Sequence, residues 1–379
     1  VMRNFWIILI VGVTLRIVLS LVTFHTDMLA FKLGGDIVAS GKIFNLYDFS
    51  NQNIAVLNYP PPIYWVHGLV NFLFGGILAI GLLIKLPYLV FDLLIGYLLF
   101  KLFTQRRQAM IAFGLWILNP VSIYATYMMG QFDIIPTFFT VLSIYLVAKK
   151  RLILAALALG GGIAFKIYPV FLLIPLLFLS KTFWDKCKIL SFAILPYVLS
   201  IAPYIGSASF RAQALFASQA DKSLNAKIPV SGGEAILLFP ACLMIFYFLL
   251  SGKKLDKLFF WKIYLIPLLL FFIFTHYHPQ WLIWITPFLI IGLVSEFRKA
   301  VLPAALIFTS WFTSLFFFDP SLTLGMFTPI FAPLQNAQSI WVYLNLHPDY
   351  NLARSLIQTV FVAGSFYLIY YHFPRKNNA

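Results

Sequence analysis

The stretch that decides the fold is ILAIGLLIKLPYLVFDLLIGYLLF, residues 77–100. Its charged side chains are Lys85 and Asp92 alone. A transmembrane helix needs about 20 mostly apolar residues to cross the hydrocarbon core of a bilayer, so this stretch predicts a membrane span. A charge inside a span is costly unless it is paired. We therefore expect Lys85 and Asp92 to pair with other helices of the bundle.

The composition extends this prediction to the whole chain of 379 residues. Hydrophobic residues make up 61%, charged residues 10%, and the mean hydropathy is +0.91. Soluble domains are about 45–50% apolar and about 25% charged. No polar stretch is long enough to form a soluble domain, so we predict one all-α, polytopic membrane domain over residues 1–379. The two cysteines, Cys187 and Cys242, predict no disulfide framework.

The placement of the basic residues predicts the topology. The formal net charge of +15 comes from clusters that lie between apolar segments, which is typical of the positive-inside rule and of contact with anionic lipids rather than of nucleic-acid binding. If every cluster faces the cytoplasm, two spans join each neighbouring pair. The bundle then has about twelve helices, and the first is a span rather than a cleaved signal peptide. The predicted spans are residues 5–24, 79–101, 109–128, 132–148, 152–166, 168–180, 189–205, 235–251, 259–275, 281–295, 301–318 and 352–372.

This topology leaves three long segments on the outer face: residues 25–77, 206–234 and 319–351. Long loops in compact proteins are usually functional. Within the first loop, the apolar run 63–74 reaches only about 18 Å as a helix, which is too short for a core of about 30 Å. We therefore expect it to be an interfacial or re-entrant helix.

Two acids in the first outer loop are candidates for chemistry. Asp27 directly follows the first span, where its carboxylate could deprotonate a hydroxyl group. Asp36 follows two glycines and is a candidate substrate-binding residue. For both acids, the alternative is an ordinary helix cap or a solvated side chain.

A second group lies at the turn GQFD, residues 130–133. Asp133 would cap the helix that follows, a contribution of about 1 kcal/mol, or Gln131 and Asp133 would contact a polar ligand. The sequence leaves both readings open.

Among the candidate site residues, Lys166 gives the strongest indication of a ligand. A helix over residues 152–166 is about 22 Å long, which places this ammonium group below the outer lipid interface. A charge in a span costs about 2.5–3.5 kcal/mol, so Lys166 needs an anionic partner or a water-filled cavity. A phosphate group would serve, and snorkelling to the interface is the alternative. Tyr168 and the helix-breaking Pro169 follow at once.

The turn HYHPQ, residues 276–280, is also predicted on the outer face. His276, His278 and Gln280 could donate hydrogen bonds to a phosphate group, or could simply be interfacial polar residues. Two histidines without a third nearby ligand are a weak metal motif, so we expect no metal.

The order of these motifs resembles the GT-C superfamily of membrane glycosyltransferases, which use polyprenyl-phosphate sugars as donors. It is most similar to the catalytic subunit of glycosylphosphatidylinositol mannosyltransferase I and to bacterial polyprenyl-phosphate-mannose α-mannosyltransferases. The motifs that carry the resemblance are Asp27, Ser40-Gly41-Lys42, Leu46-Tyr47, Tyr59-Pro60-Pro61, Leu118-Asn119-Pro120, Gly130-Gln131-Phe132-Asp133, Phe165-Lys166-Ile167-Tyr168-Pro169-Val170 and Gln280-Trp281-Leu282-Ile283-Trp284. One departure is His25, which stands where the mannosyltransferase I type has the first acid of an Asp-x-Asp pair. Asp27 is therefore the one matching carboxylate.

The resemblance implies an inverting transfer of a sugar, with mannose favoured, from a polyprenyl- or dolichyl-phosphate donor to a glycan or lipid acceptor. Asp27 would be the general base, and Lys166, helped by His276, His278 and Gln280, would bind the donor phosphate. Substrate contacts are expected from Asp36, Tyr59, Gln131, Asp133 and Tyr168. No cofactor is implied.

The resemblance is strongest over a module of residues 5–180, followed by C-terminal helices over residues 181–379. It implies a multi-pass protein of a prokaryotic plasma membrane or the endoplasmic reticulum, with its site on the outer or luminal face. A transporter or flippase of lipid-linked sugars, or a lipid-glycan ligase, would share the lysine and the outer loops without requiring Asp27 as a base.

Overall fold

The computed structural model describes residues 2–49, 56–215 and 222–374, and it is almost entirely helical. The longer helices are α1 (Met2–Val22), α4 (Ile80–Leu102), α5 (Arg106–Ile117), α7 (Ile134–Ala148), α8 (Leu152–Phe165), α10 (Phe183–Ile201), α12 (Leu238–Leu250), α13 (Phe260–Phe274), α14 (Thr286–Ser295), α15 (Phe297–Ser314) and α17 (Tyr350–His372). The shorter helices are α2 (Asp27–Ala39), α3 (Pro61–Phe74), α6 (Pro120–Ser122), α9 (Leu173–Leu177), α11 (Ala208–Phe210) and α16 (Ile340–Tyr343). The predicted all-α class is confirmed.

Within the described residues, six helical segments are long and apolar enough to cross a membrane. They are Asn4–Val22, Ile80–Leu102, Arg106–Met128, Phe183–Tyr204, Phe297–Phe317 and Tyr350–His372. The other predicted spans fall on shorter apolar helices such as α8, which has 14 residues and a length of about 21 Å. The predicted segments are therefore helical, while their number as membrane crossings stays a prediction.

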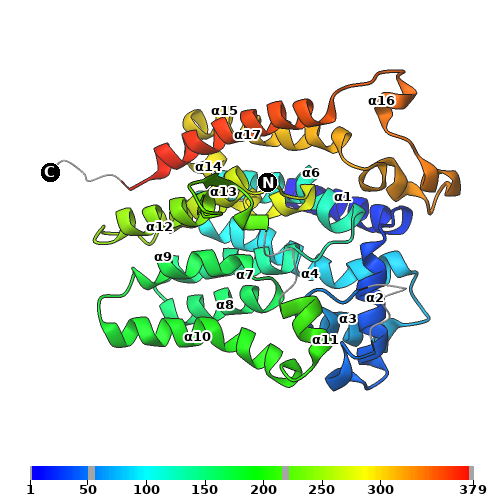
Figure 1. Ribbon diagram of the computed structural model, residues 1–379, viewed down its shortest axis with the longest axis horizontal. Coiled ribbons are helices and arrows are strands. Elements are labelled where there is room, and N and C mark those ends of the chain that lie inside the picture. The colour runs from blue at the N-terminus through cyan, green and yellow to red at the C-terminus, as the bar shows by residue number, and fades with distance from the viewer. Residues whose placement is uncertain (1, 50–55, 216–221, 375–379) are drawn as a thin grey trace.

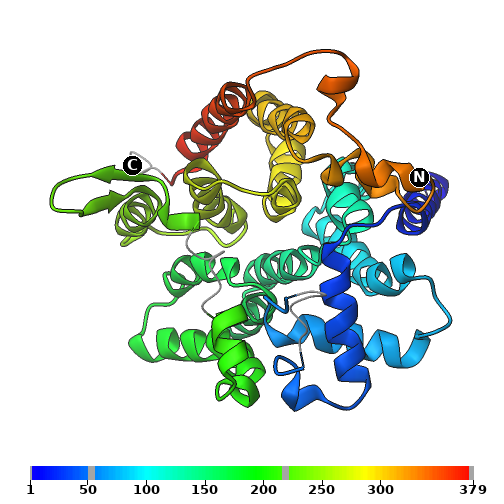
Figure 2. The ribbon, with the colours of Figure 1, turned by 45° about the vertical axis from the view of Figure 1, so that its right-hand side comes forward.

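The long helices run side by side, and the longer predicted loops 25–77 and 319–351 lie toward one end of the bundle. In Figure 1 most of these helices lie from left to right, whereas α2 runs across them at the right-hand end, beside α3 and on the same side as α16. Figure 2, turned by 45°, shows several of the long helices nearly end-on, with α2 crossing in front of them. This end of the bundle holds the predicted outer loops, and we call it the outer end.

The predicted first outer loop contains two helices that pack closely against each other. A Cβ atom on Gly34 of α2 would lie 2.1 Å from the ring of Tyr64 on α3, so this crossing needs glycine. Asp36 accepts hydrogen bonds of 2.6 Å from Asn71 Nδ2 and of 2.6 Å from Lys32 Nζ. Asp36 therefore joins α2 to α3. Its predicted role in substrate binding has no support from this position.

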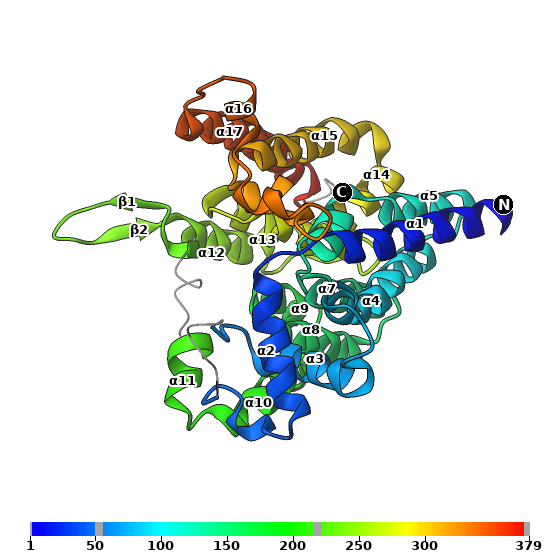
Figure 3. The ribbon, with the colours of Figure 1, turned by 90° about the vertical axis from the view of Figure 1, so that its right-hand side faces the viewer.

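A short hairpin was not anticipated from the sequence. Strand β1 (Lys227–Pro229) pairs in antiparallel fashion with β2 (Ala235–Leu237), with Ile228 opposite Ile236. The hairpin lies within the predicted loop 206–234 and the start of the next helix. Figure 3 shows it projecting away from the helices, so it does not contribute to the bundle core.

The core of the bundle contains a buried ion pair between α1 and α4. Arg16 Nε donates to Asp92 Oδ2 over 2.6 Å, and both side chains are 0% exposed. Trp116 Nε1 and Tyr127 Oη donate to the same carboxylate over 2.7 Å each. Lys85 donates separately to the backbone carbonyl and hydroxyl of Thr23, over 2.9 and 3.0 Å. The expectation that Lys85 and Asp92 pair with other helices is confirmed.

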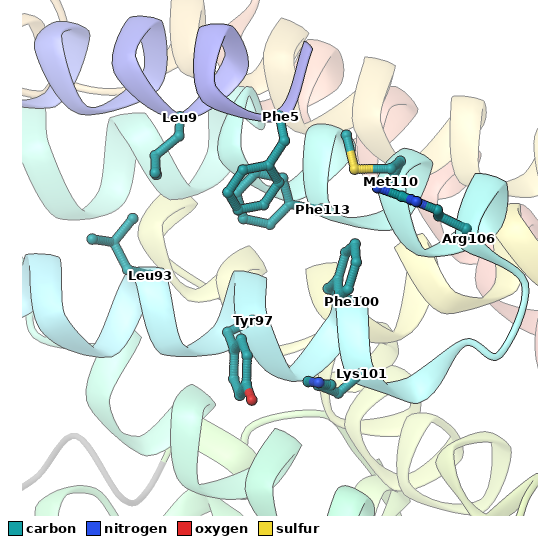
Figure 4. A pocket seen from close by; sticks show the side chains of 9 residues that line it. All are labelled: Phe5, Leu9, Leu93, Tyr97, Phe100, Lys101, Arg106, Met110 and Phe113. Atoms are coloured by element: carbon teal, nitrogen blue, oxygen red, sulfur yellow. The ribbon is translucent and has the colours of Figure 1, made fainter. Parts of the chain in front are cut away.

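An apolar cavity of about 360 Å³ lies far from this outer end, between α1, α4 and α5. Figure 4 shows Phe5 and Phe113 between its walls, with Lys101 and Arg106 at one side. Phe5 is near the start of α1, and a helix of 21 residues is about 31 Å long. The cavity is therefore separated from Asp27 by most of the bundle's length and is not the site of the chemistry proposed below.

The buried pair gives a stability prediction. We expect Arg16→Met to lower the free energy of unfolding by about 3–5 kcal/mol, because Asp92 is then left as a buried, unpaired carboxylate. The double variant Arg16→Met/Asp92→Leu should regain most of the loss. Thermal unfolding in detergent, followed by intrinsic fluorescence, measures both.

The matched control is Lys188→Met. Its partner Asp185 is 3.7 Å away, and the two side chains are 63% and 53% exposed, so the expected loss is below about 1 kcal/mol. Equal destabilisation by the two single variants would contradict the assignment of Arg16 and Asp92 as a core pair.

Candidate active site

Asp27 lies where the chain leaves α1 and enters α2. The backbone N–H of Phe24 donates to the Met326 carbonyl over 2.8 Å and anchors this connection. Thr26 is the N-cap residue of α2, so Asp27 is its first helical residue and not the cap. The Asp27 side chain is 45% exposed, and its Oδ2 accepts a 2.6 Å hydrogen bond from Gln131 Nε2. The carboxylate is thus held in place and still open to a ligand.

Gln131 reaches Asp27 because of the turn that precedes α7. A π-helix over Ile123–Met128 ends just before Gly130, whose φ is +70°. A Cβ atom on Gly130 would lie 2.6 Å from Met28 Sδ, so this position needs glycine for both its conformation and its contact. Gln131 is 1% exposed, and its Oε1 has no hydrogen-bond partner among the described residues. The side-chain NH₂ group of Gln131 therefore serves to hold Asp27.

A second carboxylate, Asp133, is buried and paired with Lys166. Lys166 Nζ donates to Asp133 Oδ1 over 2.7 Å, and Trp284 Nε1 donates to the same oxygen over 2.6 Å. Asp133 occupies the N-cap position of α7, but its side chain makes no capping hydrogen bond. Asp133 is thus the N-cap residue by position but stabilises the helix through no side-chain capping bond, and the anionic partner that Lys166 requires is this carboxylate.

Lys166 is surrounded by aromatic rings. Its Nζ lies between 5.3 and 5.7 Å from the ring centroids of Tyr59, Phe132, Trp281 and Trp284. Aromatic faces attract cations at such distances. Lys166 ends α8 in an extended conformation, so its side chain leaves the helix toward this aromatic cluster. An ammonium group has three N–H donors, and the ion pair uses one of them.

Two tyrosines belong to the surroundings of Lys166. Burial raises the pKa of Tyr59 well above its usual range, and the negative charges of Asp27 and Asp133 raise it further. Tyr59 is therefore within electrostatic reach of both acids. Tyr168 stacks on Trp284 with centroids 4.0 Å apart and an interplanar angle of 5°. The predicted residues Tyr59 and Tyr168 thus lie beside Lys166.

Lys222 is a second cation of the site that the sequence analysis missed. Its Nζ lies 2.9 Å from His278 Nε2 and 5.4 Å from the Trp281 ring centroid. Burial lowers the pKa of Lys222, and the positive charge of Lys166 lowers it further. Nothing in the sequence distinguishes this lysine from Lys227 in the same loop. Only the fold brings Lys222 to the site.

The histidines of the predicted outer turn differ in their surroundings. Burial and the charge of Lys222 lower the pKa of His278 to about 4, so at neutral pH its imidazole accepts from the Lys222 ammonium group. His276 is exposed, 6.1 Å from the His278 ring by centroids. Gln280 is buried in the 3₁₀ helix Pro279–Trp284, and its Oε1 has no partner within the described part of the chain.

A cavity of about 360 Å³ opens beside Lys166. The residues that line it include Asn58, Tyr59, Lys166, Tyr168, Trp281 and Trp284. In residues 2–49, 56–215 and 222–374, no group of three or more His, Cys, Asp or Glu side chains is placed to hold a metal ion. The site therefore offers cations, aromatic faces and one accessible carboxylate.

The ion pair of the site gives a second stability prediction. We expect Lys166→Met to lower the free energy of unfolding by about 3 kcal/mol, because Asp133 is 0% exposed and loses its charged partner. Adding Asp133→Asn should restore part of this loss. The midpoint of thermal unfolding in detergent reports both effects, and an unchanged midpoint for Lys166→Met would show that Asp133 is not a buried anion.

Part of the chain is similar in sequence to known mannosyltransferases. Residues 126–265 match the family described as Mannosyltransferase (PIG-M). The chain is 31% identical over 109 residues to GPI mannosyltransferase 1 of Dictyostelium discoideum, covering 27% of this chain and 24% of that protein. It is 37% identical over 89 residues to GPI mannosyltransferase 1 of Schizosaccharomyces pombe, covering 22% and 24%. The matches thus span about a quarter of the length of these curated relatives.

The fold is similar along nearly the whole chain to a solved structure. ArnT from Cupriavidus metallidurans, crystallised with undecaprenyl phosphate, aligns with a TM-score of 0.53 and 12% sequence identity, covering 96% of this chain and 77% of that one. The family match includes Gln131, Asp133 and Lys166, all of which lie in the site described above. Taken together, residues 126–265 are similar to mannosyltransferases of the PIG-M type, and the chain shares its fold with ArnT along nearly its whole length.

Proposed function

We propose that this protein is an inverting mannosyltransferase that moves mannose from a polyprenyl-phosphate donor to a hydroxyl group of a glycan or lipid acceptor. One observation carries the proposal. Two ammonium groups, Lys166 and Lys222, lie 5.3 and 5.4 Å from the centroid of the same ring, Trp281. The partly exposed carboxylate of Asp27 is held by Gln131, the residue next to Phe132 of the ring cluster around Lys166. Two neighbouring cations repel each other, and a phosphate group placed between them would stabilise both.

The geometry favours Asp27 over the other acids as the general base. Asp133 is fully buried and already accepts hydrogen bonds from Lys166 and Trp284. Asp36 binds Asn71 and Lys32 between α2 and α3. Asp27 combines partial exposure with a fixed orientation, because Gln131 holds one of its oxygens.

In the proposed reaction, the acceptor hydroxyl oxygen attacks the anomeric carbon of the donor sugar. A carbon–oxygen bond to the acceptor forms while the bond to the phosphate oxygen breaks, which inverts the configuration at that carbon. Asp27 takes the hydroxyl proton, and the electron pair of the broken bond leaves with the lipid phosphate. Lys166 and Lys222 stabilise the negative charge that develops on the leaving phosphate, the kind of electrostatic effect that preorganised donors supply.

The comparisons support the sugar and the donor class of this proposal. The relatives are named as mannosyltransferases, which favours mannose as the sugar, and the ArnT structure holds undecaprenyl phosphate, which favours a polyprenyl-phosphate donor. His278 would act by positioning Lys222. His276 and Gln280 lie on either side of His278 in the sequence and are proposed as further donors to the phosphate group.

The base assignment predicts a large loss of activity in Asp27→Asn. A general base contributes about 10²–10⁴ in rate, so transfer should fall by that factor while donor binding is retained, because the amide keeps the shape of the carboxylate. The measurement uses purified protein in liposomes with polyprenyl-phosphate-[¹⁴C]mannose and a lipid and glycan extract as acceptor.

Asp36→Asn is the matched control, since it changes an acid on the same helix and should keep most of the transfer activity. Equal transfer by wild type and Asp27→Asn would refute Asp27 as the base. If wild type does not bind the donor at all, the donor class is wrong, and transport or ligation of lipid-linked sugars becomes the better proposal.

We further propose that the site faces the periplasm, cell exterior or organelle lumen of a plasma or endoplasmic reticulum membrane. The proposal predicts opposite accessibility for two cysteines in a background that otherwise has none. In sealed vesicles, Phe44→Cys, at a position 71% exposed in the first outer loop, should react with a membrane-impermeant maleimide from the site side. Cys187, beside Lys186 and Lys188, should react only from the opposite side. Labelling of both from one side would overturn the topology.

A further inference from the structure

The apolar cavity between α1, α4 and α5 is not used by the proposed reaction. Three pairs of its lining residues, each pair four positions apart, are Phe5 and Leu9 on α1, Tyr97 and Lys101 on α4, and Arg106 and Met110 on α5. Residues four positions apart lie on one face of a helix. Each of the three helices therefore turns one face toward the same space.

The cavity is present because α1 is held closely at one level of the bundle and less closely at the next. A Cβ atom on Gly12 of α1 would lie 2.2 Å from the side chain of Ile117, just after α5, and Arg16 is paired with a carboxylate of α4. Phe5 lies about two turns before Gly12. Its ring stacks on Phe113 with centroids 4.5 Å apart, and Figure 4 shows the two rings occupying only part of the space between the helices. About 360 Å³ is left open.

The size and lining of this space suit an apolar chain. Ligand pockets have volumes of about 300–1,000 Å³, and 360 Å³ falls within that range. The lining residues other than Lys101 and Arg106 are aromatic or apolar, and they would lose dispersion contacts if the space stayed empty. On the other side of α1, Trp6 and Ile10 are exposed, as expected of a helix at the lipid-facing edge of the bundle. An acyl chain can therefore enter from the bilayer.

Lys101 and Arg106 give one side of the cavity a positive charge. Figure 4 shows them on neighbouring helices at the same side. Lys101 Nζ lies 5.5 Å from the Tyr97 ring centroid, which keeps the ammonium group beside the cavity. In the part of the chain that the structure describes, neither cation forms an ion pair with a carboxylate. Guanidinium groups bind phosphate oxygens in a bidentate manner, so this side of the cavity suits a phosphate group.

The two cations lie at the depth of lipid headgroups. The segments Ile80–Leu102 and Arg106–Met128 are each long and apolar enough to cross a membrane. Lys101 is in the last turn of the first segment, and Arg106 is the first residue of the second. Basic residues at the ends of spans lie at the membrane interface, and basic pockets between spans bind anionic headgroups. The apolar lining then lies at the depth of the acyl chains.

We propose that this cavity binds one anionic phospholipid, with its phosphate group on Lys101 and Arg106 and an acyl chain along Phe5, Leu9 and Met110. The two unpaired cations select an anionic lipid over a zwitterionic one of the same chain length. The bound lipid fastens α1 to α4 and α5 at the level where the helices leave a space between them. The cavity lies far from Asp27, so this inference goes beyond the proposed function and does not depend on it.

The test measures lipid binding to the full chain in detergent by native mass spectrometry. The probes are dioleoylphosphatidylglycerol, which is anionic, and dioleoylphosphatidylcholine, which has the same chains and no net charge. We expect wild type to bind phosphatidylglycerol more tightly. Arg106→Gln and Lys101→Gln should each weaken phosphatidylglycerol binding about fivefold, the effect of one basic residue on an anionic lipid, and leave phosphatidylcholine binding unchanged.

Arg107→Gln is the matched control. It removes the same charge from the neighbouring residue, which does not line the cavity, so it should bind both lipids as wild type does. Met110→Trp fills the apolar part of the cavity and should weaken both lipids alike. The side chains of Lys101, Arg106 and Arg107 are exposed, so their variants should keep the wild-type midpoint of thermal unfolding without lipid. Added phosphatidylglycerol should raise that midpoint more in wild type than in Arg106→Gln.

Three outcomes would overturn the proposal. Equal binding of the two lipids by wild type would show that the cavity does not select an anionic headgroup. Equal weakening by Arg106→Gln and Arg107→Gln would show that these cations form a diffuse basic surface rather than a site. Unchanged binding of both lipids by Met110→Trp would show that no acyl chain lies in the cavity.

Discussion

A charge inside this apolar bundle needs a polar or charged partner, and this requirement shapes the site. Lys166 ends a short helix below the predicted outer interface, where an isolated ammonium group would be costly. Asp133 and Trp284 meet it there, over 2.7 and 2.6 Å to one shared carboxylate oxygen. Because Asp133, Lys166 and Trp284 come from three different segments, the pairing draws α7, α8 and the 3₁₀ helix Pro279–Trp284 together. The aromatic cluster and the cavity beside it follow from that convergence.

The same principle acts deeper in the bundle. Arg16 and Asp92 form a fully buried pair, and Trp116 and Tyr127 complete the hydrogen bonding of the carboxylate. This network joins α1 to α4 and lines none of the cavities described above, whereas Lys166 of the second pair lines the cavity beside it. Similar chemistry thus serves structure in one place and the proposed catalysis in another. The two pairs differ in how accessible their neighbours are to a ligand. Asp27 and Lys222, which belong to the site of the second pair, remain open to one.

The cavity beside Lys166 gives the proposed transferase its donor site. Its lining combines Lys166 with the rings of Tyr59, Tyr168, Trp281 and Trp284, which suits the phosphate and the sugar of the donor. Asp27 is partly exposed and is held in place by Gln131, so it is the group that a hydroxyl acceptor would meet.

The sequence by itself determined the fold class, because apolar stretches of span length leave no alternative to helices in a bilayer. It also indicated that Lys166 needs an anion and that Asp27 and Gln131 are candidate site residues, because polar groups are rare in such a chain. Only the tertiary structure decided that the anion is Asp133, that Asp36 binds Asn71 between two helices, and that Lys222 meets His278 and Trp281. These pairings join residues up to 151 positions apart, as from Asp133 to Trp284. Local pattern carries no information on such distances, because they depend on how whole helices pack.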